Sequence, residues 1–326
     1  MSEIRKHYFL DEYCIISPGR YKRPSDFAHQ EKESNTKNCF FCAGNEDQTP
    51  PSTAVYKKGE ILKDTEESLV KGWDVRCIPN LYPALTPEPE NIPQSMWNSS
   101  EGFGYHEVIV ETPDHEMTIS GFPDKQMSLL MKVYRDRCTY YESQEGVEYA
   151  SLFKNWGSRA GASLEHAHSQ LIALPFIPPM IKREQEAIHN SDECPYCEIV
   201  EKERKSERLL YENNDFIAIA PYFSTALFEI WILPKQHVNH LGECSEGMLK
   251  SLGDAVKFVV SRYEERLGSP SYNYMFHQIT GDEKYHLNLR VQPVITTLGG
   301  FEKNTDVHIN TVTPEYAAQC LKGDID

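Results

Sequence analysis

The chain has 326 residues, which exceeds one typical domain, and its formal net charge at pH 7 is −16. So acidic a composition argues against a general nucleic-acid or anionic-membrane surface, and an anionic small molecule must bind where basic groups and amides are concentrated. No apolar run approaches membrane-spanning length, and the N-terminus M-S-E-I-R-K-H lacks the apolar core of a signal peptide. We expect a cytoplasmic protein with no membrane segment and no nucleic-acid partner.

Basic residues gather near the N-terminus, after a predicted strand over Tyr13 to Ser17. The strand enters a Pro-Gly turn, and Arg20, Lys22 and Arg23 follow. In so acidic a chain this cluster is a candidate phosphate-binding group, with a solvated turn as the alternative.

Four of the nine cysteines form two C-x-x-C pairs, Cys39 with Cys42 and Cys194 with Cys197. In a reducing compartment such pairs favour metal or redox chemistry over structural disulfides. The sequence C-P-Y-C at 194–197 also resembles the redox pair of glutaredoxins, which leaves thiol exchange as an alternative.

Between the first cysteine pair and the centre of the chain we predict two strands, a loop and a helix. The segment Trp73 to Leu85 predicts a strand that breaks into an ordered turn, and Thr86 to Gly102 predicts a long surface loop. A β-rich strand, E-V-I-V-E-T-P-D-H, covers Glu107 to His115. Apolar residues at helical spacing from Met127 to Tyr141, behind an Asp124 cap, predict a core-facing helix.

The centre of the chain, residues 155–175, reads N-W-G-S-R-A-G-A-S-L-E-H-A-H-S-Q-L-I-A-L-P. Alternation of His166, His168 and Gln170 before an apolar run predicts a strand with all three on one face. The small residues before them let backbone amides approach a phosphate closely. A neutral imidazole can attack phosphorus, and a glutamine amide can donate to a non-bridging oxygen. Each histidine alone is more often structural, and only the combination points to phosphorus chemistry.

The second half repeats this order. A charged helix over Lys182 to Ser191 leads into C-P-Y-C, which corresponds to C-F-F-C at 39–42. The segment Glu229 to His237 then matches the length of the strand over Glu107 to His115, and both end in histidine.

The repeat continues to the end of the second half. An amphipathic helix from Met248 to Leu267 stops at Gly268, and Y-H-L-N-L-R at 285–290 places His286 opposite His166. We infer an internal duplication, with one half over residues 1–179 and the other over 180–326.

Each half offers two cysteines and two histidines, and thiolates and imidazoles in a closed set of four suit tetrahedral zinc. We predict one structural zinc site per half, and the second site is open to another divalent metal. The predicted ligands are Cys39, Cys42, His115 and His166 in the first half and Cys194, Cys197, His237 and His286 in the second. Glu184 and His240 are the substitute ligands if the second site departs from this scheme.

The duplication also indicates where chemistry is absent. The second half has Asn288 and Arg290 where the first has His168 and Gln170. Because asparagine cannot form a phosphoramidate, we expect the first half to keep the nucleophile and the second half to be structural.

Taken together, these segments resemble the galactose-1-phosphate uridylyltransferase family of the histidine-triad superfamily over nearly the whole chain. The matching segments are I-S-P-G-R-Y-K-R-P, C-F-F-C, N-L-Y-P-A-L, T-P-D-H, N-W-G-S-R-A-G-A-S, H-A-H-S-Q and P-E-Y-A-A. The resemblance implies an α+β fold of two fused histidine-triad-like halves, each mostly antiparallel sheet with a helix packed on it, and a homodimer. It also implies a ping-pong reaction, in which His168 attacks the α-phosphorus of a nucleoside-diphosphate sugar, releases sugar 1-phosphate and passes the nucleotidyl group to a phosphate-bearing acceptor.

Carried over by position, the resemblance assigns the phosphoryl oxygens to Gln170 and places Arg20 and Arg23 near the substrate phosphates. It also implies that the nucleotide pocket is lined by Asn80, Asn155, Gly161 and Ser163. Where many uridylyltransferases have a cysteine and an acidic residue, this chain has Ala162 and Leu81. The segments G-G-F-E-K-N-T, I-N-T-V-T-P-E and E-I-W-I-L-P-K look closer to the ADP-glucose phosphorylase branch, which transfers adenylyl to inorganic phosphate.

We therefore expect an enzyme that transfers uridylyl from UDP-glucose to a hexose 1-phosphate such as galactose 1-phosphate. Adenylyl transfer from an ADP-sugar to inorganic phosphate is the first alternative. A zinc-stabilised nucleotide-binding protein without turnover is the alternative from another class.

Overall fold

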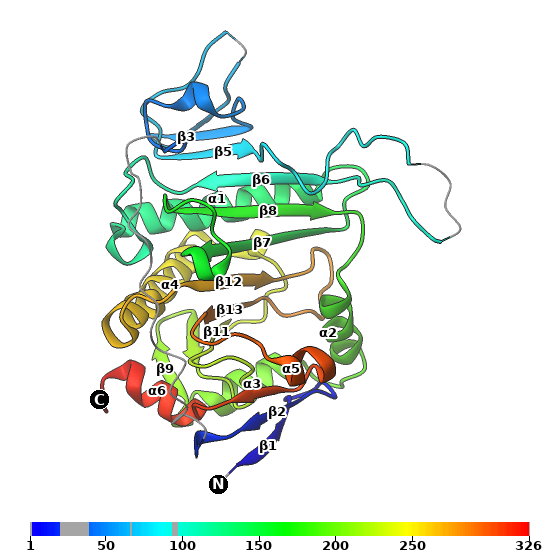
Figure 1. Ribbon diagram of the computed structural model, residues 1–326, viewed down its shortest axis with the longest axis vertical. Helices are drawn as coiled ribbons and strands as arrows, with labels where there is room; N and C mark the ends of the chain where they lie inside the picture. Colours follow the sequence, from blue (N-terminus) through cyan, green and yellow to red (C-terminus); the bar gives the residue numbers. More distant parts are fainter. Residues whose placement is uncertain (1, 20–38, 66, 93–96, 326) are drawn as a thin grey trace.

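An eleven-stranded sheet, with strand order β4-β3-β5-β6-β8-β7-β12-β13-β11-β10-β9, forms the centre of the computed structural model (Figure 1). The structure describes residues 2–19, 39–65, 67–92 and 97–325. Within these residues every ladder of the large sheet is antiparallel. Helices cover parts of both faces, so the predicted α+β class is confirmed.

The elements follow the predicted order. The first half contributes β3 (Ala54–Lys57), β4 (Glu60–Leu62), β5 (Val75–Pro79), β6 (Tyr105–Val110), α1 (Asp124–Glu142), β7 (Tyr149–Trp156) and β8 (His168–Leu174). The second half contributes α2 (Pro179–His189), α3 (Pro195–Glu203), β9 (Leu209–Glu212), β10 (Phe216–Ile219), β11 (Ile230–Pro234), α4 (Glu246–Leu267), β12 (Tyr272–His277) and β13 (Asn288–Pro293). A small sheet joins β1 (Glu3–Lys6), β2 (Tyr13–Ile16) and β14 (His308–Asn310), beside α5 (Gly300–Thr305) and α6 (Pro314–Lys322).

The sheet has an internal two-fold pattern about its middle. Read outward from the centre, β7-β8-β6-β5-β3 on one side matches β12-β13-β11-β10-β9 on the other. The two halves meet where β7 pairs with β12, and Asn155 stands opposite Asn273. The arrangement is the one expected of a duplicated unit, and it places both halves in one continuous sheet.

Helices α1 and α4 lie side by side on one face of this sheet (Figure 1). Their apolar stripes join the core-facing side chains of the strands in one cluster, as the helical spacing predicted. The Ser245 hydroxyl caps α4 by accepting from the Met248 amide, and Gly268 ends it in the left-handed conformation at φ 74°. The predicted Asp124 cap is wrong, because Asp124 is the first residue of α1 and its side chain makes no capping bond.

Two predicted strands are shorter than their sequence patterns. The strand expected over Glu107 to His115 ends at Val110, and its counterpart before His237 ends at Pro234. Pro113 has no amide to continue the ladder, so the chain leaves the sheet and carries His115 away from it. Strand β8 begins at His168, and His166 therefore lies just before the strand.

The opposite face of the sheet is covered unequally. Over the second half, α2, α3 and the N-terminal residues Tyr8 and Phe9 pack onto Trp231 and Leu233 of β11. Over the first half, Val108 and Val110 of β6 are covered by residues outside helices and strands, Phe41, Val70 and Trp73. This difference leaves room for a cavity directly over β6 and β8 of the first half.

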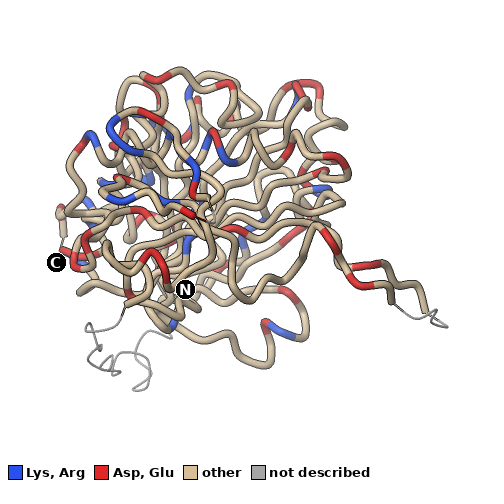
Figure 2. Tube along the Cα trace, turned by 90° about the horizontal axis from the view of Figure 1, so that it is seen from above, with Lys and Arg blue, Asp and Glu red and all other residues tan. Residues whose placement is uncertain are grey.

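Charge is mixed over the part of the chain that the structure describes. Acidic and basic residues are interspersed there and do not form an extended basic surface (Figure 2). Among these residues no helix combines the length and the apolar character needed to cross a membrane.

A buried ion pair lies beneath the centre of the sheet. The Lys154 ammonium lies 2.7 Å from the Glu111 carboxylate, and both side chains are 0% exposed. Lys154 also donates to the carbonyl oxygen of His168 at 2.9 Å, and the Tyr134 hydroxyl donates to Glu111 at 2.9 Å. Burial lowers the pKa of Lys154, and the Glu111 carboxylate opposes this shift. The pair therefore supports the backbone at the start of β8.

Replacing Lys154 with Met should lower the free energy of unfolding by about 3–5 kcal/mol, because Glu111 would stay buried without its ion partner. The matched control is Lys250→Met, which removes a surface pair with Asp254 and should leave the unfolding midpoint nearly unchanged. Urea unfolding followed by circular dichroism compares the two variants. Equal midpoints for both would contradict the importance of the buried pair.

Candidate active site and metal centres

His168, the first residue of β8, is held in one tautomer. Its Nδ1 lies 2.8 Å from the carbonyl oxygen of His166, which can only accept, so Nδ1 carries the proton and Nε2 keeps its lone pair. Burial lowers the pKa of His168 to about 4, and the nearby Lys154 ammonium adds to this shift. The ring is thus a neutral imidazole with one nitrogen available for attack.

Gln170 lies two residues along the same strand, on the same face. Its Oε1 is 2.9 Å from Nε2 of His106 on the neighbouring strand β6. The Nδ1 atom of His106 accepts the backbone N–H of Ala84 at 3.1 Å, so the proton of this ring is on Nε2 and is donated to Gln170. The amide nitrogen of Gln170 is then left with its two hydrogens for another acceptor.

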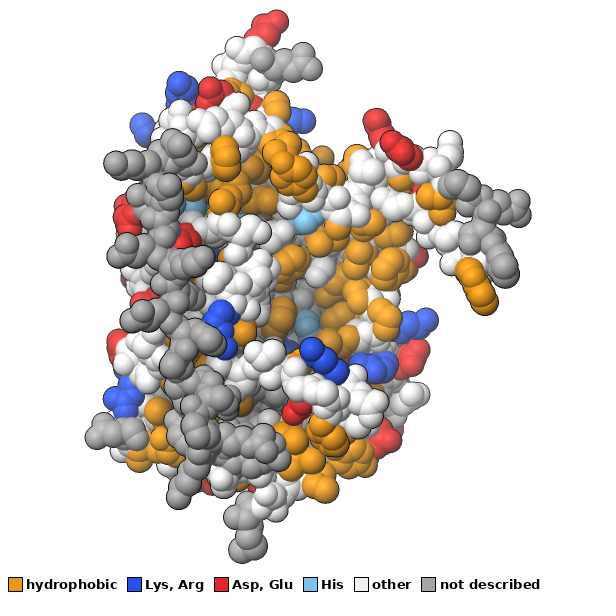
Figure 3. All heavy atoms as spheres, viewed as in Figure 1, with side chains coloured by type: hydrophobic (Ala, Val, Ile, Leu, Met, Phe, Trp, Pro, Cys, Tyr) orange, Lys and Arg blue, Asp and Glu red, His pale blue; other side chains and the backbone are white. Residues whose placement is uncertain are grey.

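A cavity of about 460 Å³ opens at these side chains. Figure 3 shows the same face of the molecule, where hydrophobic and histidine side chains gather in a hollow. One part of the lining is apolar, with Phe40, Phe41, Ile78, Leu81, Tyr82 and Val108. The other part is polar, with Asn80, Ser163, His168 and Gln170. An apolar wall next to hydrogen-bonding groups is suited to a molecule with a flat ring at one end and phosphate at the other.

Asn80 has a fixed orientation in this cavity. Its Oδ1 accepts the Tyr82 amide at 2.9 Å, and its Nδ2 lies on the other side, 3.1 Å from Nε2 of His106. The ordered turn predicted after β5 therefore positions a second carboxamide donor beside Gln170.

The small-residue loop after β7 differs in detail from the sequence prediction. The amides of Ala160, Gly161 and Ala162 donate to carbonyl oxygens of Gly157 and Ser158 inside the loop. These three amides are therefore not available to a phosphate. At Gly157, with φ 80°, an added Cβ would lie 2.2 Å from the hydroxyl of Ser271, so the second half of the chain abuts this loop directly.

Asn155 is oriented by a residue of the second half. Asn273 donates to Asn155 Oδ1 at 2.8 Å and to the Ala160 carbonyl at 2.9 Å. This leaves the Asn155 amide nitrogen on the side of Gly161. Strand β12 thus sets the shape of the loop that belongs to the first half.

The predicted substrate-binding residues divide into three groups. Asn80 and Ser163 line the cavity, whereas Asn155, in β7, and Gly161, in the loop after it, are not among the lining residues. Arg20 and Arg23 lie outside the described residues. Leu81 contributes to the wall as predicted, whereas Ala162 is not among the lining residues.

The four predicted metal ligands of the first half come together, with their donor atoms within 4.8 Å of one another. The Cys39 and Cys42 sulfurs lie 3.6 Å and 3.7 Å from His166 Nδ1, and the Cys42 sulfur lies 3.4 Å from His115 Nδ1. Zinc bonds of about 2.3 Å to sulfur and 2.0–2.1 Å to nitrogen place these atoms about 3.6 Å apart in a tetrahedron. The donor set therefore fits a tetrahedral zinc ion.

The second half repeats this geometry. The Cys194 and Cys197 sulfurs both lie 3.6 Å from His286 Nδ1, and the Cys197 sulfur lies 3.4 Å from His237 Nδ1. His286 Nε2 donates to the Pro234 carbonyl at 3.2 Å, just as His166 Nε2 donates to the Thr112 carbonyl at 2.7 Å. Such bonds fix the ring so that Nδ1 faces the metal position.

The substitute ligands, Glu184 and His240, belong to neither group. His240 lies 2.8 Å from Glu142 instead. Glu184 is fully buried and pairs with Arg290 of β13. Burial opposes ionisation of Glu184, but the Arg290 guanidinium and His277 hold the pKa of its carboxyl well below its usual range.

The second half has the same framework around Asn288 but no nucleophile. Asn288 Nδ2 donates to the His286 carbonyl at 3.3 Å, in the position that His168 Nδ1 has in the first half. Arg290, at the position of Gln170, lies 4.6 Å from the Trp231 ring centroid and pairs with Glu184. The space that forms a cavity in the first half is filled here.

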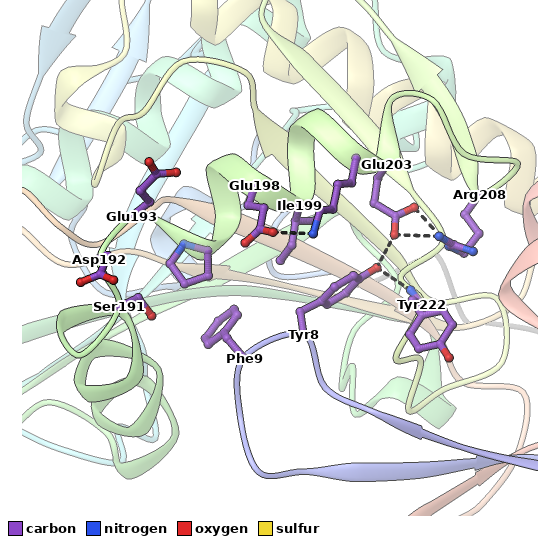
Figure 4. A pocket seen from close by; sticks show the side chains of 12 residues that line it. Tyr8, Phe9, Ser191, Asp192, Glu193, Glu198, Ile199, Glu203, Arg208 and Tyr222 are labelled. Carbon is purple, nitrogen blue, oxygen red and sulfur yellow. Dashed lines mark hydrogen bonds and ion pairs between the residues drawn. The ribbon is translucent and has the colours of Figure 1, made fainter.

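A second cavity of about 520 Å³ lies between the N-terminal strands and α3 (Figure 4). Its walls carry four carboxylates, Asp192, Glu193, Glu198 and Glu203. Its two cations, Lys202 and Arg208, are paired with Glu198 and Glu203. So acidic a lining disfavours a phosphate-bearing ligand, which leaves the cavity at His168 as the candidate active site.

Two residues at the site were missed from the sequence. His106 alternates with Val108 and Val110 along β6, and this signal marks it as sharing their face. Lys154 is the single charge in strand β7, which is a signal for a buried ion pair.

The comparisons with known proteins agree with this geometry. Residues 1–178 match the family described as galactose-1-phosphate uridyl transferase, N-terminal domain, and residues 123–322 match a domain of unknown function, DUF4921. The chain is 31% identical to the ADP-glucose phosphorylase of Arabidopsis thaliana, over 98% of this chain and 92% of that protein. It is 29% identical to the galactose-1-phosphate uridylyltransferase of Thermotoga maritima, over 99% and 98%.

Solved structures show the same relationship. A crystal structure of the Arabidopsis thaliana ADP-glucose phosphorylase with bound ADP-glucose has a TM-score of 0.83 and 29% identity, and it covers 100% of both chains. A uridylyltransferase structure has a TM-score of 0.77 and 26% identity, with 99% of this chain and 98% of that one covered. The predicted resemblance is confirmed, and the chain belongs to the galactose-1-phosphate uridylyltransferase family of nucleotidyltransferases.

Proposed function

We propose that this enzyme moves a nucleoside monophosphate from a nucleoside-diphosphate sugar to a phosphate-bearing acceptor through a covalent nucleotidyl-His168. The observation that carries the proposal is the tautomer of His168, whose Nδ1 is bonded to the His166 carbonyl while the side chain lines the cavity. With Nδ1 hydrogen-bonded, Nε2 is the ring nitrogen of His168 that keeps a lone pair for the phosphorus of a substrate in the cavity.

The reaction takes two steps. The Nε2 lone pair attacks the α-phosphorus, a bond from nitrogen to phosphorus forms, and the bond to the bridging oxygen breaks, so sugar 1-phosphate leaves with that electron pair. The Nδ1–H stays bonded to the His166 carbonyl, which stabilises the charge that develops on the ring. A phosphate oxygen of the acceptor then attacks the same phosphorus and releases His168.

Polar side chains around His168 support the phosphates. We assign the non-bridging oxygens to the Gln170 amide, with Asn80 and Ser163 at the cavity wall. Asn155 and Gly161 shape the adjoining loop. Contacts of Arg20 and Arg23 with the phosphates stay a prediction, because these residues lie outside the described part of the chain.

We consider two nucleotide sugars as the nucleotidyl donor, and a different observation supports each of them. Our main proposal is transfer of uridylyl from UDP-glucose to a hexose 1-phosphate such as galactose 1-phosphate, which the family match over residues 1–178 supports. Adenylyl transfer from an ADP-sugar to inorganic phosphate is supported by the 31% identity with an ADP-glucose phosphorylase. The apolar wall with Phe40, Phe41 and Leu81 suits stacking of either base.

We also propose that each Cys2His2 group holds zinc. Zinc, when bound, would tie each cysteine pair to the start of the neighbouring strand, and in the first half that strand carries His168. The halves at residues 1–179 and 180–326 would then share one framework but differ in role, with chemistry confined to the first.

The homodimer and the cytoplasmic location stay predictions. Large apolar side chains are exposed at the cavity, Leu81 and Tyr82, and in the segment before β6, Ile92 and Trp97, which supports a partner surface on these segments.

Elemental analysis of protein purified without added metal should give about two zinc ions per chain, because each closed four-ligand set holds one ion. Cys194→Ser should lower the zinc content to about one ion and lower the thermal midpoint, while the folded fraction keeps residual turnover. Cys320→Ser, outside both groups, is the control and should keep both ions. Protein without metal, with both C-x-x-C pairs oxidised, would favour the redox alternative.

Replacing His168 with Asn should abolish transfer and leave nucleotide-sugar binding in place, because Asn can donate to the His166 carbonyl as Asn288 does in the second half. Calorimetry measures the binding, and product formation measures transfer. His189→Asn, on the exposed surface of α2, is the control. A His168→Asn rate above about one hundredth of the wild-type rate would contradict a covalent role for His168.

Competition between UDP-glucose and ADP-glucose should label His168 with both nucleotides. The reason is that an apolar wall with Phe40, Phe41 and Leu81 discriminates weakly between uracil and adenine. Intact-mass analysis of the acid-labile adduct separates uridylyl from adenylyl additions. Labelling by one nucleotide alone, by more than roughly a thousandfold, would mean that a base-specific hydrogen bond exists. If neither nucleotide labels the protein although both bind, the nucleotide-binding protein without turnover would be the better description.

A further inference from the structure

His106 connects two parts of the candidate site that come from different segments of the chain. On one side, its Nδ1 accepts the backbone N–H of Ala84 at 3.1 Å. On the other, its Nε2 lies 2.9 Å from Oε1 of Gln170 and 3.1 Å from Nδ2 of Asn80. In the pairing of β6 with β8, Val108 stands opposite Gln170 and His106 stands opposite Ile172, so His106 is the diagonal neighbour of Gln170. His106, Val108 and Gln170 therefore lie on the face of the sheet where the cavity opens.

The Ala84 contact decides which nitrogen of His106 carries the proton. A backbone N–H can only donate, so Nδ1 must accept and Nε2 must hold the hydrogen. Burial lowers the pKa of His106, which favours the neutral ring that this arrangement requires. Nε2 therefore donates to Gln170, whose side chain must present its oxygen to the ring. The Asn80 Nδ2 group, 3.1 Å from the same nitrogen, can only donate, so Gln170 is the acceptor of this proton.

The orientation of Gln170 matters because its carboxamide has two unlike ends. With Oε1 turned to His106, the Nε2 hydrogens point elsewhere and can donate to a phosphoryl oxygen. With the carboxamide turned by 180°, its oxygen would face the negatively charged phosphate and repel it. Without the donor on His106, no hydrogen bond from that ring selects between the two orientations of Gln170.

We propose that His106 is a positioning residue for nucleotidyl transfer, which holds the Gln170 amide with its hydrogens toward the transferred phosphoryl group. This inference rests on the proposed function of His168 and adds a residue to it. His106 itself need not contact the substrate, since its bond to Gln170 already determines the orientation of that side chain. Its second bond, to Ala84, anchors the turn that carries Asn80 and Leu81 to the same strand.

Two substitutions separate these bonds. His106→Asn keeps an acceptor near the position of Nδ1 for Ala84 but has no donor that reaches Gln170. His106→Gln keeps a donor near the position of Nε2 but loses the acceptor for Ala84. His189→Asn on α2 again serves as a control outside the site.

The experiment is rapid-quench formation of the nucleotidyl adduct, with UDP-glucose and ADP-glucose used separately over a range of concentrations. For His106→Asn we expect the maximal rate of adduct formation to fall about tenfold to a hundredfold, because a misaligned donor stabilises the transition state poorly. The half-saturating concentration should stay within about threefold, since Ala84 keeps its anchor. For His106→Gln the maximal rate should recover to within about threefold of wild type, while the half-saturating concentration rises.

A double-mutant cycle tests whether His106 acts through Gln170. His106→Asn combined with Gln170→Ala should be no slower than Gln170→Ala alone, because the group that His106 orients is then gone. The inference would be overturned if the rate losses of the two single variants multiply in the double variant. It would also be overturned if folded His106→Asn keeps the wild-type maximal rate. Either result would leave the proposed function standing. Wild-type protein that forms no adduct with either nucleotide sugar would overturn both.

Discussion

The two-residue spacing of His166 and His168 is the constraint on which the site depends. His166 offers Nδ1 to the cysteine pair, Nε2 to the Thr112 carbonyl and its own carbonyl to His168. One residue thus joins the Cys2His2 group of the first half to the ring that lines the cavity. Lys154 bonds to the carbonyl of His168 from below, with its charge balanced by buried Glu111. The His168 ring, which we propose as the nucleophile, therefore needs little reorganisation before it reacts, and preorganisation of this kind lowers a barrier.

Duplication explains both the shape of the sheet and its unequal chemistry. The metal groups, the ring bonds to Thr112 and Pro234, and the donors on His168 and Asn288 are repeated in each half. At the position of Gln170 the second half has Arg290, which pairs with Glu184, and helices α2 and α3 cover this face of the sheet. It still contributes to the reaction site, because Asn273 and Ser271 shape the loop beside the cavity.

Residues whose roles follow from local spacing were predictable from the sequence. Repeated C-x-x-C pairs and histidines identified both four-ligand groups, and alternation put His168 and Gln170 on one face. Features that depend on strand register were not predictable in this way. His106 reaches Gln170 only because β6 pairs with β8 in one register, and Asn273 reaches Asn155 only through the pairing of β7 with β12. The loop over Gly157 to Ala162 looked rich in free amides, but its turn uses three of them internally.

The central claim is that the α-phosphorus passes through a bond to His168, and stereochemistry tests it most directly. Each in-line displacement inverts the configuration at phosphorus, so two displacements restore it. A nucleotide sugar made chiral by sulfur at the α-phosphorus should give a product in which the configuration is retained. Inversion would mean a single direct transfer from donor to acceptor, and it would contradict a covalent intermediate on His168.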